Sequence, residues 1–481
     1  MKKTIAITIG AAIALQALHA SATVRMPHVF SDNMVVQADT LASLWGYATP
    51  KSEVTVSGSW GAQASAKADK DGRWKTSIAT PAASYEPLQI TVTDKADNES
   101  LTFSNVLAGE VWFASGQSNM EMPLRGYLHQ PIEGAGDEIM FSSKLGKGIR
   151  FINVPRTVHY EPQEDFEGAW QVSRPSTVGE LSALAWFFAR YLGDVIDRPI
   201  GIINAAWGGS KVEGWVHEGI LSKYPDRDYN AEKNNPDMND WERVGIMYNS
   251  LLHPVAGYTA RGFLWNQGES NVGGHNYYPD RQNDMVEYWR SLWGNPDMQF
   301  YFVELPGWDY GDVNRIDAAL FREAQHKAEK LTRGSHIICT SDLVYPDEPD
   351  DIHARNKREL GKRMAAAAAT YSYGIEGIPH VYPTFKDVEY KGNEAVLSFN
   401  DAWGGFTPNE DLQGFEVAGA DKVFHPASAQ PDRNGYTITV SSPEVSDIKA
   451  VRYCFKNFAI GRLHDAYGLP LVPFRTDDWD N

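Results

Sequence analysis

The chain has 481 residues, 42% of them hydrophobic and 22% charged, an ordinary balance for a globular protein of about two to four domains. Its net charge of −18, without any run rich in lysine and arginine, excludes the basic surface that binding to a nucleic-acid backbone needs. Only Cys339 and Cys454 occur, so cysteines alone cannot build a four-ligand zinc cage. Each lies in an apolar run typical of a buried strand, although the two could pair in an exported protein.

Residues 1–22 predict an export signal rather than part of the fold. Lys2 and Lys3 precede a largely apolar stretch from Ile5 to Leu18, and Ala20-Ser21-Ala22 then supplies a small-x-small cleavage pattern. No cysteine follows for lipid attachment, and the apolar stretch is too short to span a membrane comfortably. We therefore expect a mature chain that begins near Thr23, has no membrane span and is periplasmic or extracellular.

Residues 23–107 predict a small N-terminal β domain. Short alternating runs such as Val54–Val56 and Leu88–Val92 are separated by turn-rich stretches such as Asp69–Gly72. Short strands at regular spacing are typical of a β-sandwich.

Residues 108–375 predict a different architecture, in which apolar strands alternate with helices. The expected strands are Val111–Ala114, Ile200–Ala206, Gly262–Asn266, Gln299–Leu305 and His336–Asp342. The expected helices are Leu181–Val195, Tyr278–Leu292 and Asn356–Tyr371. This alternation predicts an α/β fold with a doubly wound, mainly parallel sheet and helices on both faces. In such sheets, ligands bind beyond the carboxyl ends of the strands.

Residues 376–481 return to a β pattern. Ala395–Phe399 and Tyr436–Val440 alternate apolar and polar side chains, and no helix of useful length is expected. The sequence therefore predicts a C-terminal domain that is also β-sandwich-like.

Polar residues gather directly after the first predicted strand of the α/β region. Gly116 allows the backbone to turn sharply, so that Ser118 can project its hydroxyl above the sheet edge. The helix that follows would aim backbone N–H groups at the same place, which favours an anion. A nucleophilic serine needs this arrangement, although Ser118 and Asn119 also suit an ordinary helix N-cap. Met120 replaces the final glycine of the G-x-S-x-G elbow, so this is a different motif.

The next two predicted strands end in comparable clusters. Trp207-Gly208-Gly209-Ser210 follows one strand, and its paired glycines suit either a close approach to a ligand or a plain tight turn. Gln267-Gly268-Glu269-Ser270-Asn271 follows the other. The Gln267 amide could donate to a developing oxyanion, while Glu269 and Asn271 could hold the loop by hydrogen bonds. A purely structural loop is the competing interpretation.

The fourth cluster, Asp350-Asp351-Ile352-His353, precedes the last predicted helix. A serine nucleophile needs a base such as His353, and the imidazole needs a group that fixes its tautomer. A histidine in a loop is by itself usually not catalytic. All four clusters, however, fall at the same end of consecutive strands. This coincidence favours a catalytic site over four unrelated structural loops.

The run from Gly109 to Pro123, GEVWFASGQSNMEMP, resembles the nucleophile block of the sialate O-acetylesterase family, which belongs to the SGNH hydrolase superfamily. Asn204–Gly209, Trp265–Asn271 and Asp351–His353 resemble its later blocks. The resemblance extends from about residue 26 to residue 477. It implies an SGNH-hydrolase-like fold and a secreted serine carbohydrate esterase that removes O-acetyl groups from a sugar such as sialic acid.

The resemblance also implies roles for particular residues. Ser118 would be the nucleophile and His353 the general base. The implied oxyanion donors are the backbones of Ser118 and of Gly208 or Gly209, together with Gln267. The residues expected to contact substrate or to support the loops are Gln117, Asn119, Trp207, Glu269 and Asn271.

The partner that orients His353 stays open at this stage. Asp350 fits the D-x-x-H spacing of the superfamily and is narrowly favoured, whereas Asp351 fits the D-I-H run of the family. Some members use a backbone carbonyl instead. Two departures could reshape the pocket: Ala354 stands where the family often has proline, and Asn266 where it often has an aromatic residue.

Three other functions remain compatible with the sequence. An acetyl xylan or other plant-glycan acetylesterase would share the fold and differ only in its pocket. A non-catalytic carbohydrate-binding protein would suit the flanking β domains and the 15 tryptophans. An acetyl transferase could use the same triad.

No cofactor or metal is expected, because there is no H-E-x-x-H motif and the 13 histidines do not cluster at ligand spacing. The expected partner is an O-acetylated carbohydrate and not a nucleic acid. The sequence sets no oligomeric state.

Overall fold

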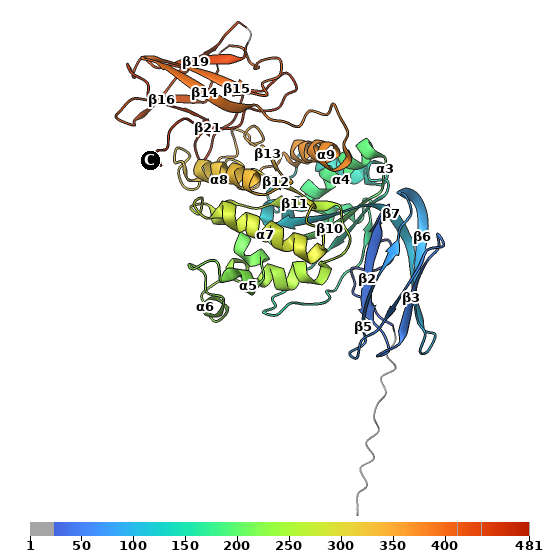
Figure 1. Cartoon of the computed structure of the whole chain (residues 1–481). Helices are drawn as coiled ribbons and strands as arrows, with labels where there is room; N and C mark the ends of the chain where they lie inside the picture. The colour runs from blue at the N-terminus through green and yellow to red at the C-terminus, as the bar shows by residue number, and fades with distance from the viewer. Residues whose placement is uncertain (1–23, 411, 434, 481) are drawn as a thin grey trace, which may run out of the picture.

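The structure is a computed structural model that describes residues 24–410, 412–433 and 435–480. The predicted export signal in residues 1–22 lies outside these described residues. Figure 1 shows three parts in chain order: an N-terminal β domain in blue, a central α/β domain and a C-terminal β domain in orange and red. The fold class expected from the sequence is confirmed.

The N-terminal domain is antiparallel apart from one strand pair. β2 (Leu41–Tyr47) pairs with β5 (Arg73–Ala79), and β3 (Glu53–Gly58) lies between β4 (Gln63–Lys67) and β6 (Ser84–Asp94). Alternate residues of β2 and β3 are buried, as the alternating sequence predicts, because successive side chains of a strand point to opposite faces.

The strand β7 (Ser100–Gly116) joins the first two domains without a break. Its first part pairs with β6 and with the short β1 (Val35–Gln37), and its second part pairs with strands of the central sheet. The sequence placed a domain boundary near residue 107 and a separate strand at Val111–Ala114. The structure shows that Val111–Ala114 is part of one strand of 17 residues, which runs through the predicted boundary because residues 106–116 are all buried and contain no turn-forming segment.

The central sheet has the strand order β13-β12-β11-β7-β10-β8-β9. All neighbouring pairs on this path are parallel except β8 with β9. Their bounds are β8 Ile149–Asn153, β9 Gln171–Val172, β10 Ile200–Ala206, β11 Gly262–Asn266, β12 Gln299–Val303 and β13 Ser335–Ile338. The chain order reverses at β7, which lies between β10 and β11. A ligand site is expected beyond the carboxyl ends of the strands at such a switch point.

Four long helices cover the two faces of this sheet. Helices α4 (Ala183–Ile196) and α9 (Lys357–Tyr373) pack together on one face, and α7 (Tyr278–Trp293) and α8 (Asp317–Leu331) on the other. The adjacent residues Trp112 and Phe113 of β7 belong to different clusters, Trp112 with α4 and α9 and Phe113 with α7. Both faces are therefore buried, as in a doubly wound fold.

Short helical segments fill the loops. The α-helical ones are α1 Ser118–Glu121, α2 Ala135–Met140, α3 Ser142–Leu145, α5 Glu218–Leu221 and α6 Tyr229–Lys233. The others are η1 Val178–Glu180, η2 Val212–Trp215, η3 Asp240–Glu242, η4 Tyr248–Leu252, η5 His253–Val255 and η6 Glu269–Asn271.

The C-terminal domain consists of two four-stranded antiparallel sheets, β14-β15-β19-β18 and β17-β16-β20-β21. The bounds are β14 Thr384–Lys391, β15 Glu394–Asn400, β16 Phe415–Ala418, β17 Phe424–Pro426, β18 Ser428–Pro431, β19 Thr437–Ser441, β20 Ala450–Tyr453 and β21 Phe474–Arg475. Cys454 follows β20 and Cys339 follows β13, and both thiols are buried and unpaired.

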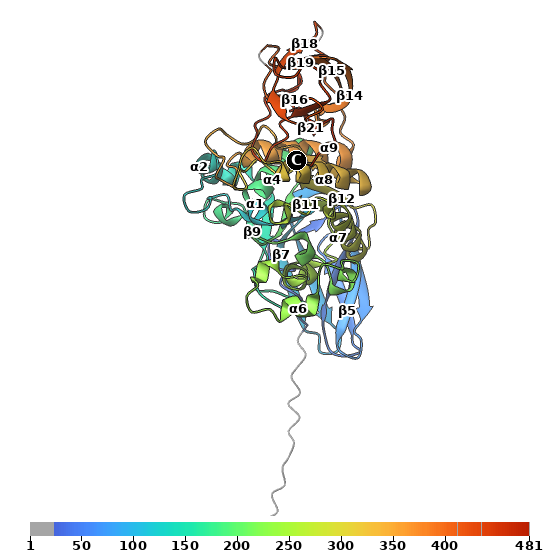
Figure 2. The same ribbon diagram turned by 90° about the vertical axis from the view of Figure 1, so that its left-hand side faces the viewer.

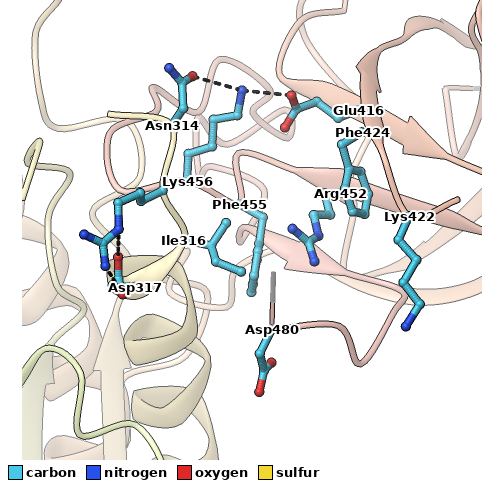
Figure 3. Close-up of a pocket in the computed structure, with 11 residues that line it drawn as sticks. Asn314, Ile316, Asp317, Glu416, Lys422, Phe424, Arg452, Phe455, Lys456 and Asp480 are labelled. Carbon is cyan, nitrogen blue, oxygen red and sulfur yellow. Dashed lines mark hydrogen bonds and ion pairs between the residues drawn. The ribbon is translucent and has the colours of Figure 1, made fainter. Parts of the chain in front are cut away.

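The C-terminal domain is attached to the start of α8 through Asn457. The Asn457 side chain accepts from Ala318 N–H (2.9 Å) and donates to the carbonyl oxygens of Asp309 (3.2 Å) and Asp312 (3.1 Å). A hollow of about 600 Å³ lies beside this contact. Figure 3 shows the residues that line the hollow, and Figure 2 shows the C-terminal sheets next to α8. None of the predicted site residues lines the hollow.

The described residues contain neither a membrane-spanning helix nor a cluster of metal-binding side chains. No helix in that part of the chain is both long and apolar enough to cross a bilayer. No group of three or more His, Cys, Asp or Glu side chains there is arranged to hold a metal ion.

Candidate active site

The strands β7, β10 and β11 end in register, so the loops that follow them begin side by side at one edge of the sheet. Gly116 pairs with Ala206 of β10 on one side and with Asn266 of β11 on the other. A Cβ atom on Gly116 would lie only 2.1 Å from the Asn266 carbonyl oxygen, and the φ of Gly116 is +140°. Only glycine fits this position. The chain therefore turns sharply here, and α1 begins at Ser118.

The residues beside Ser118 are locked in place while Ser118 itself stays partly exposed. The buried Gln117 side-chain oxygen accepts from the N–H groups of Gly268 (3.2 Å) and Ser270 (3.5 Å). The backbone N–H of Gln117 donates to the Asn266 carbonyl oxygen (2.9 Å). Gln117 thus ties the serine turn to the loop after β11, which is a framework role.

Asn119 connects the serine turn with the loop after β11, the loop that carries His353 and the start of α9. Its amide donates to the Glu269 carboxylate and to the Ile352 carbonyl oxygen (2.9 Å), and its oxygen accepts from Lys357 Nζ (2.5 Å). Burial raises the pKa of Glu269 and lowers that of Lys357 to about 8. Because Ile352 precedes His353, Asn119 holds the serine turn against the histidine loop.

The glycine pair after β10 lies against the nucleophile position. A Cβ on Gly208 would be 3.3 Å from the Ser118 Cβ. The Gly208 N–H donates to the Glu121 carboxylate (2.6 Å), whereas the N–H groups of Gly209 and Ser118 have no acceptor among the described residues. Trp207 is buried, and its backbone N–H donates to the Gly116 carbonyl oxygen (3.0 Å). Gly209 and Ser118 therefore retain free donors at this edge.

Gln267 has a different environment from the one its predicted oxyanion role requires. Its side chain is 1% exposed. The amide donates to the Ser210 carbonyl oxygen (3.0 Å) and to Asn271 Oδ1 (2.7 Å), and its oxygen accepts from the Tyr278 hydroxyl (2.9 Å). The Asn271 amide in turn donates to the Glu213 carboxylate (3.1 Å). Both amide protons of Gln267 are thus already used in hydrogen bonds to Ser210 and Asn271.

The His353 ring is hydrogen-bonded to a glutamine rather than to a carboxylate. The distance from its Nδ1 to Gln130 Oε1 is 3.0 Å, and Gln130 Nε2 donates to Asp351 Oδ1 (2.8 Å). A carboxylate can only accept, so the amide N–H₂ must face Asp351 and the amide oxygen must face the ring. Nδ1 therefore carries the proton, and Nε2 keeps its lone pair.

Neither aspartate contacts the ring as the sequence suggested. Asp351 accepts from the His353 backbone N–H (2.9 Å) as well as from Gln130. The Asp350 side chain is exposed and makes no hydrogen bond with the described residues. The His353 ring faces the segment that carries Gln130, and the role expected for Asp350 from the D-x-x-H spacing stays a prediction.

Ser118 and His353 both contact Tyr127. The Tyr127 ring lies edge-on to the His353 ring at a centroid distance of 5.3 Å, and its hydroxyl donates to the Ser118 carbonyl oxygen (3.4 Å). His353 Nε2 is buried and has no partner in the described part of the chain. The Ser118 hydroxyl makes no hydrogen bond with His353 in this structure, as is common in active sites without substrate.

The charge state of His353 suits a base. Burial lowers its pKa to about 4, and the positive charge of Lys357 adds to this effect, while Asp351 opposes it. The ring is therefore neutral at neutral pH. A neutral imidazole with a free Nε2, a partly exposed serine and free backbone N–H groups can attack a carbonyl and hold the resulting oxyanion.

A hollow of about 590 Å³ opens beside these groups. It is lined by Arg156, Trp207, Gly208, Gly209, Asp240 and Trp241. Arg156 pairs with the Glu121 carboxylate at 2.9 Å, and Glu121 also accepts from Gly208. The hollow combines two tryptophan rings with charged groups next to Ser118, as small-molecule sites commonly do.

Sequence reasoning missed several residues of this site. Gln130, Tyr127, Arg156 and Trp241 come from loops without a periodic pattern, so nothing in the sequence placed them near Ser118. Glu121 lies inside the serine motif itself, and its carboxylate is the one signal that could have been used.

Comparison with known proteins gives independent findings. The family model for carbohydrate esterases of the sialic acid-specific acetylesterase type matches residues 108–370, and a bacterial Ig domain model matches residues 27–108. A crystal structure of a novel carbohydrate acetylesterase from Xanthomonas citri superposes with a TM-score of 0.83 at 31% identity, covering 95% of this chain and 100% of that one.

Curated relatives give the same picture at lower identity. The human sialate O-acetylesterase is 24% identical over 78% of this chain and 76% of its own length. The rat sialate O-acetylesterase is 24% identical over 92% of this chain and 93% of its own length.

Proposed function

Because this chain belongs to the sialic acid-specific acetylesterase family of carbohydrate esterases, and is thus a carbohydrate acetylesterase, we propose that Ser118 is its nucleophile and His353 its general base. The observation that carries this assignment is the buried, unpartnered Nε2 of His353, whose ring contacts Tyr127, the same residue whose hydroxyl donates to the Ser118 carbonyl oxygen. A buried nitrogen without a partner is costly unless a reacting group supplies one.

The reaction would proceed in two steps. His353 Nε2 takes the proton of the Ser118 hydroxyl as its oxygen attacks the acetyl carbonyl. The ring then gives this proton to the departing sugar oxygen, which leaves an acetyl-serine. A water molecule repeats the cycle, releasing acetate and the free serine. General-base help of this kind is typically worth about 10²–10⁴-fold in rate.

The backbone N–H groups of Ser118 and Gly209 are the proposed oxyanion donors, because both lack an acceptor. The Gly208 N–H is held by Glu121 and the Gln267 amide by its framework partners. We assign Gln267 the support of the loop rather than direct contact with the oxyanion. A single donor of this type contributes roughly 10²–10³-fold to kcat.

Gln130 is the proposed positioning residue for His353. Its oxygen accepts from Nδ1, and its amide is held by Asp351. Asp351 thus acts on the His353 ring indirectly, through the neutral amide of Gln130. A neutral acceptor fixes the tautomer but stabilises the imidazolium less than a carboxylate does, consistent with the low pKa of His353.

The proposed substrate is an O-acetylated sialic acid, as for the mammalian relatives, and the alternative is an acetylated plant glycan such as xylan. Arg156 is the cation of the hollow beside Ser118 and the group that would meet a sialate carboxylate. A panel that includes 9-O-acetyl sialic acid and acetylated xylan decides between them. With a sialate substrate, Arg156→Gln raises KM for the sialate at least about tenfold, since it removes a charge-assisted contact, and leaves xylan turnover little changed.

A serine-directed organophosphonate tests the catalytic assignment itself. Covalent labelling at Ser118, with loss of acetate release, supports it. Inertness of the protein combined with sugar binding would favour the non-catalytic binding protein instead. Transfer of the acetyl group to an added sugar acceptor, in preference to water, would favour the transferase.

Export remains part of the proposal. Residues 1–22 have the composition of a cleavable signal. N-terminal sequencing of the mature protein tests this, and a mature chain that retains these residues would contradict it.

A further inference from the structure

The C-terminal domain carries a second hollow, of about 380 Å³. It is lined by Phe399, Asp401, Ala402, Trp403 and Tyr436. These residues come from the end of β15, the loop after it and the start of β19, within the domain at the top of Figure 1. We call this feature the aromatic hollow.

Two of the rings that line the aromatic hollow are largely exposed, and a third exposed ring lies next to one of them. Trp403 is 63% exposed, Tyr467 58% and Tyr436 52%. Trp403 and Tyr467 are neighbours, with ring centroids 6.2 Å apart. Single exposed apolar residues are normal on a protein surface, whereas large rings grouped around a hollow commonly mark a binding site.

The loop that presents Trp403 is held from behind. The Trp403 carbonyl oxygen accepts from the Ala466 N–H (2.8 Å). Gly404 and Gly405 have φ angles of +72° and +77°, a region that favours glycine. A Cβ on Gly404 would lie 2.6 Å from the Ala466 Cβ. The backbone is therefore fixed against the neighbouring loop while the indole stays in solvent.

The polar groups around the hollow are free to bind. The Asp401 carboxylate, the Trp403 indole N–H and the hydroxyls of Tyr436 and Tyr467 have no hydrogen-bond partner among the described residues. Three half-exposed rings offer only a few hundred Å² of surface, less than the roughly 800 Å² per partner of a stable protein interface. The patch therefore fits a small or narrow ligand.

We propose that the aromatic hollow is a second carbohydrate-binding site, for a neutral polysaccharide chain. The C–H face of a pyranose ring packs against an indole or phenol ring, and sugar hydroxyls donate to a carboxylate and accept from N–H and O–H groups. Asp401 and the net charge of −18 disfavour an anionic glycan. The proposal does not depend on the roles of Ser118 and His353.

The loop that carries Trp403 is connected to the catalytic domain through His464. The loop that carries Trp403 continues to Thr407, which pairs with His464. The His464 ring lies 3.1 Å from the Asp342 carboxylate, just beyond the carboxyl end of β13. The segment after Asp342 leads to His353. The loop that carries Trp403 is thus tied, through Thr407 and His464, to the segment that follows β13.

Affinity electrophoresis of the full-length Ser118→Ala protein tests the proposal without turnover. Gels would contain soluble arabinoxylan, mixed-linkage β-glucan or polysialic acid. We expect retarded mobility in at least one of the two neutral glycans. A Trp403→Ala, Tyr436→Ala, Tyr467→Ala combination then raises the dissociation constant about tenfold or more, because it removes the stacking surface.

Val423→Ala is the matched control, since Val423 is 52% exposed on the same domain but lies outside the hollow. It should be retarded like its parent, and unfolding temperatures of all variants report on folding. The proposal is overturned if neither neutral glycan retards the Ser118→Ala protein, if the triple variant is retarded as strongly as its parent, or if polysialic acid alone is bound. None of these outcomes bears on the catalytic assignment.

Discussion

The side of the site that carries the proposed nucleophile and the side that carries the proposed base are built in different ways. Ser118, Gly209 and Gln267 each follow a strand of the central sheet, and the pairing of Gly116 with Ala206 and Asn266 sets their level. His353, Gln130 and Tyr127 lie in long loops outside the sheet. Backbone hydrogen bonds between Tyr127 and Gln130 shape the first of these loops, and side-chain hydrogen bonds and a ring contact connect it to His353.

The two sides of the site are therefore positioned by different kinds of contact. A strand end is positioned by a ladder of backbone hydrogen bonds, which tolerates changes in the side chains around it. Between the two loops, by contrast, the orientation of the His353 ring depends on a few side-chain contacts, of which the hydrogen bond to Gln130 is one. We therefore expect backbone strain to disrupt the Ser118 side of the site, and the loss of a single side chain to disrupt the His353 side.

Removal of the nucleophile gives the largest expected effect. Ser118→Ala should lower kcat by roughly 10⁴–10⁶-fold, since the remaining groups cannot form the acetyl-enzyme. Hydrolysis of an aryl acetate by purified protein measures this. The control is Ser291→Ala, an exposed serine on α7. Retention of wild-type activity by a folded Ser118→Ala protein would remove the nucleophile assignment.

Backbone strain tests the nucleophile side next. Gly116→Ala should cost about 2–4 kcal/mol of unfolding free energy and most of the activity, because the added Cβ meets the Asn266 carbonyl oxygen. Gly294→Ala is the matched control, with a φ of +63° and open space around its Cβ position. Denaturant unfolding compares the two. Equal losses would show that the clash at Gly116 is relieved without cost.

Loss of one amide tests the base side. Gln130→Ala should lower kcat about 10–100-fold with little change in KM or unfolding temperature, because the ring loses its orienting acceptor. Leu128→Ala, at a residue 84% exposed on the same turn, is the control. Gln130→Glu should raise the pKa of His353, since a carboxylate stabilises the imidazolium. An unchanged pH profile in Gln130→Glu would contradict direct contact with the ring.

The pH dependence follows from the charge state of His353. The base must be neutral, and its pKa is lowered to about 4. As the pH falls through this value the ring becomes protonated, so kcat/KM should hold steady from neutral pH to about 5 and then fall about tenfold per unit below 4. Initial rates over this range measure the acid limb. A limb centred near 6.5 would show that the ring is solvated in the working enzyme.

The smallest effect is expected at the aspartate that the sequence favoured. Asp350→Asn should change kcat less than about twofold, because its carboxylate is exposed and bonds to no described residue. Asp351→Asn should have a larger effect, since Asp351 holds Gln130. A tenfold loss in Asp350→Asn with none in Asp351→Asn would reverse this order and restore the triad expected from the spacing.

The sequence alone determined the three-part architecture and the strand-borne half of the site. Apolar strands at β10 and β11 have the bounds predicted for them, and each ends in the expected polar cluster. Hydrophobic periodicity is local information, so strands, helices and the edge where they end can be inferred from one stretch at a time.

Only the tertiary structure decided which groups meet across that edge. Gln130 and Asp351 are distant in sequence, and the bond between them depends on the path of two loops that carry no periodic signal. The same holds for β7, where pairing with strands of both domains extends the strand beyond the bounds expected from the sequence. Long-range hydrogen bonds and burial set these features, and neither is encoded in the spacing of neighbouring residues.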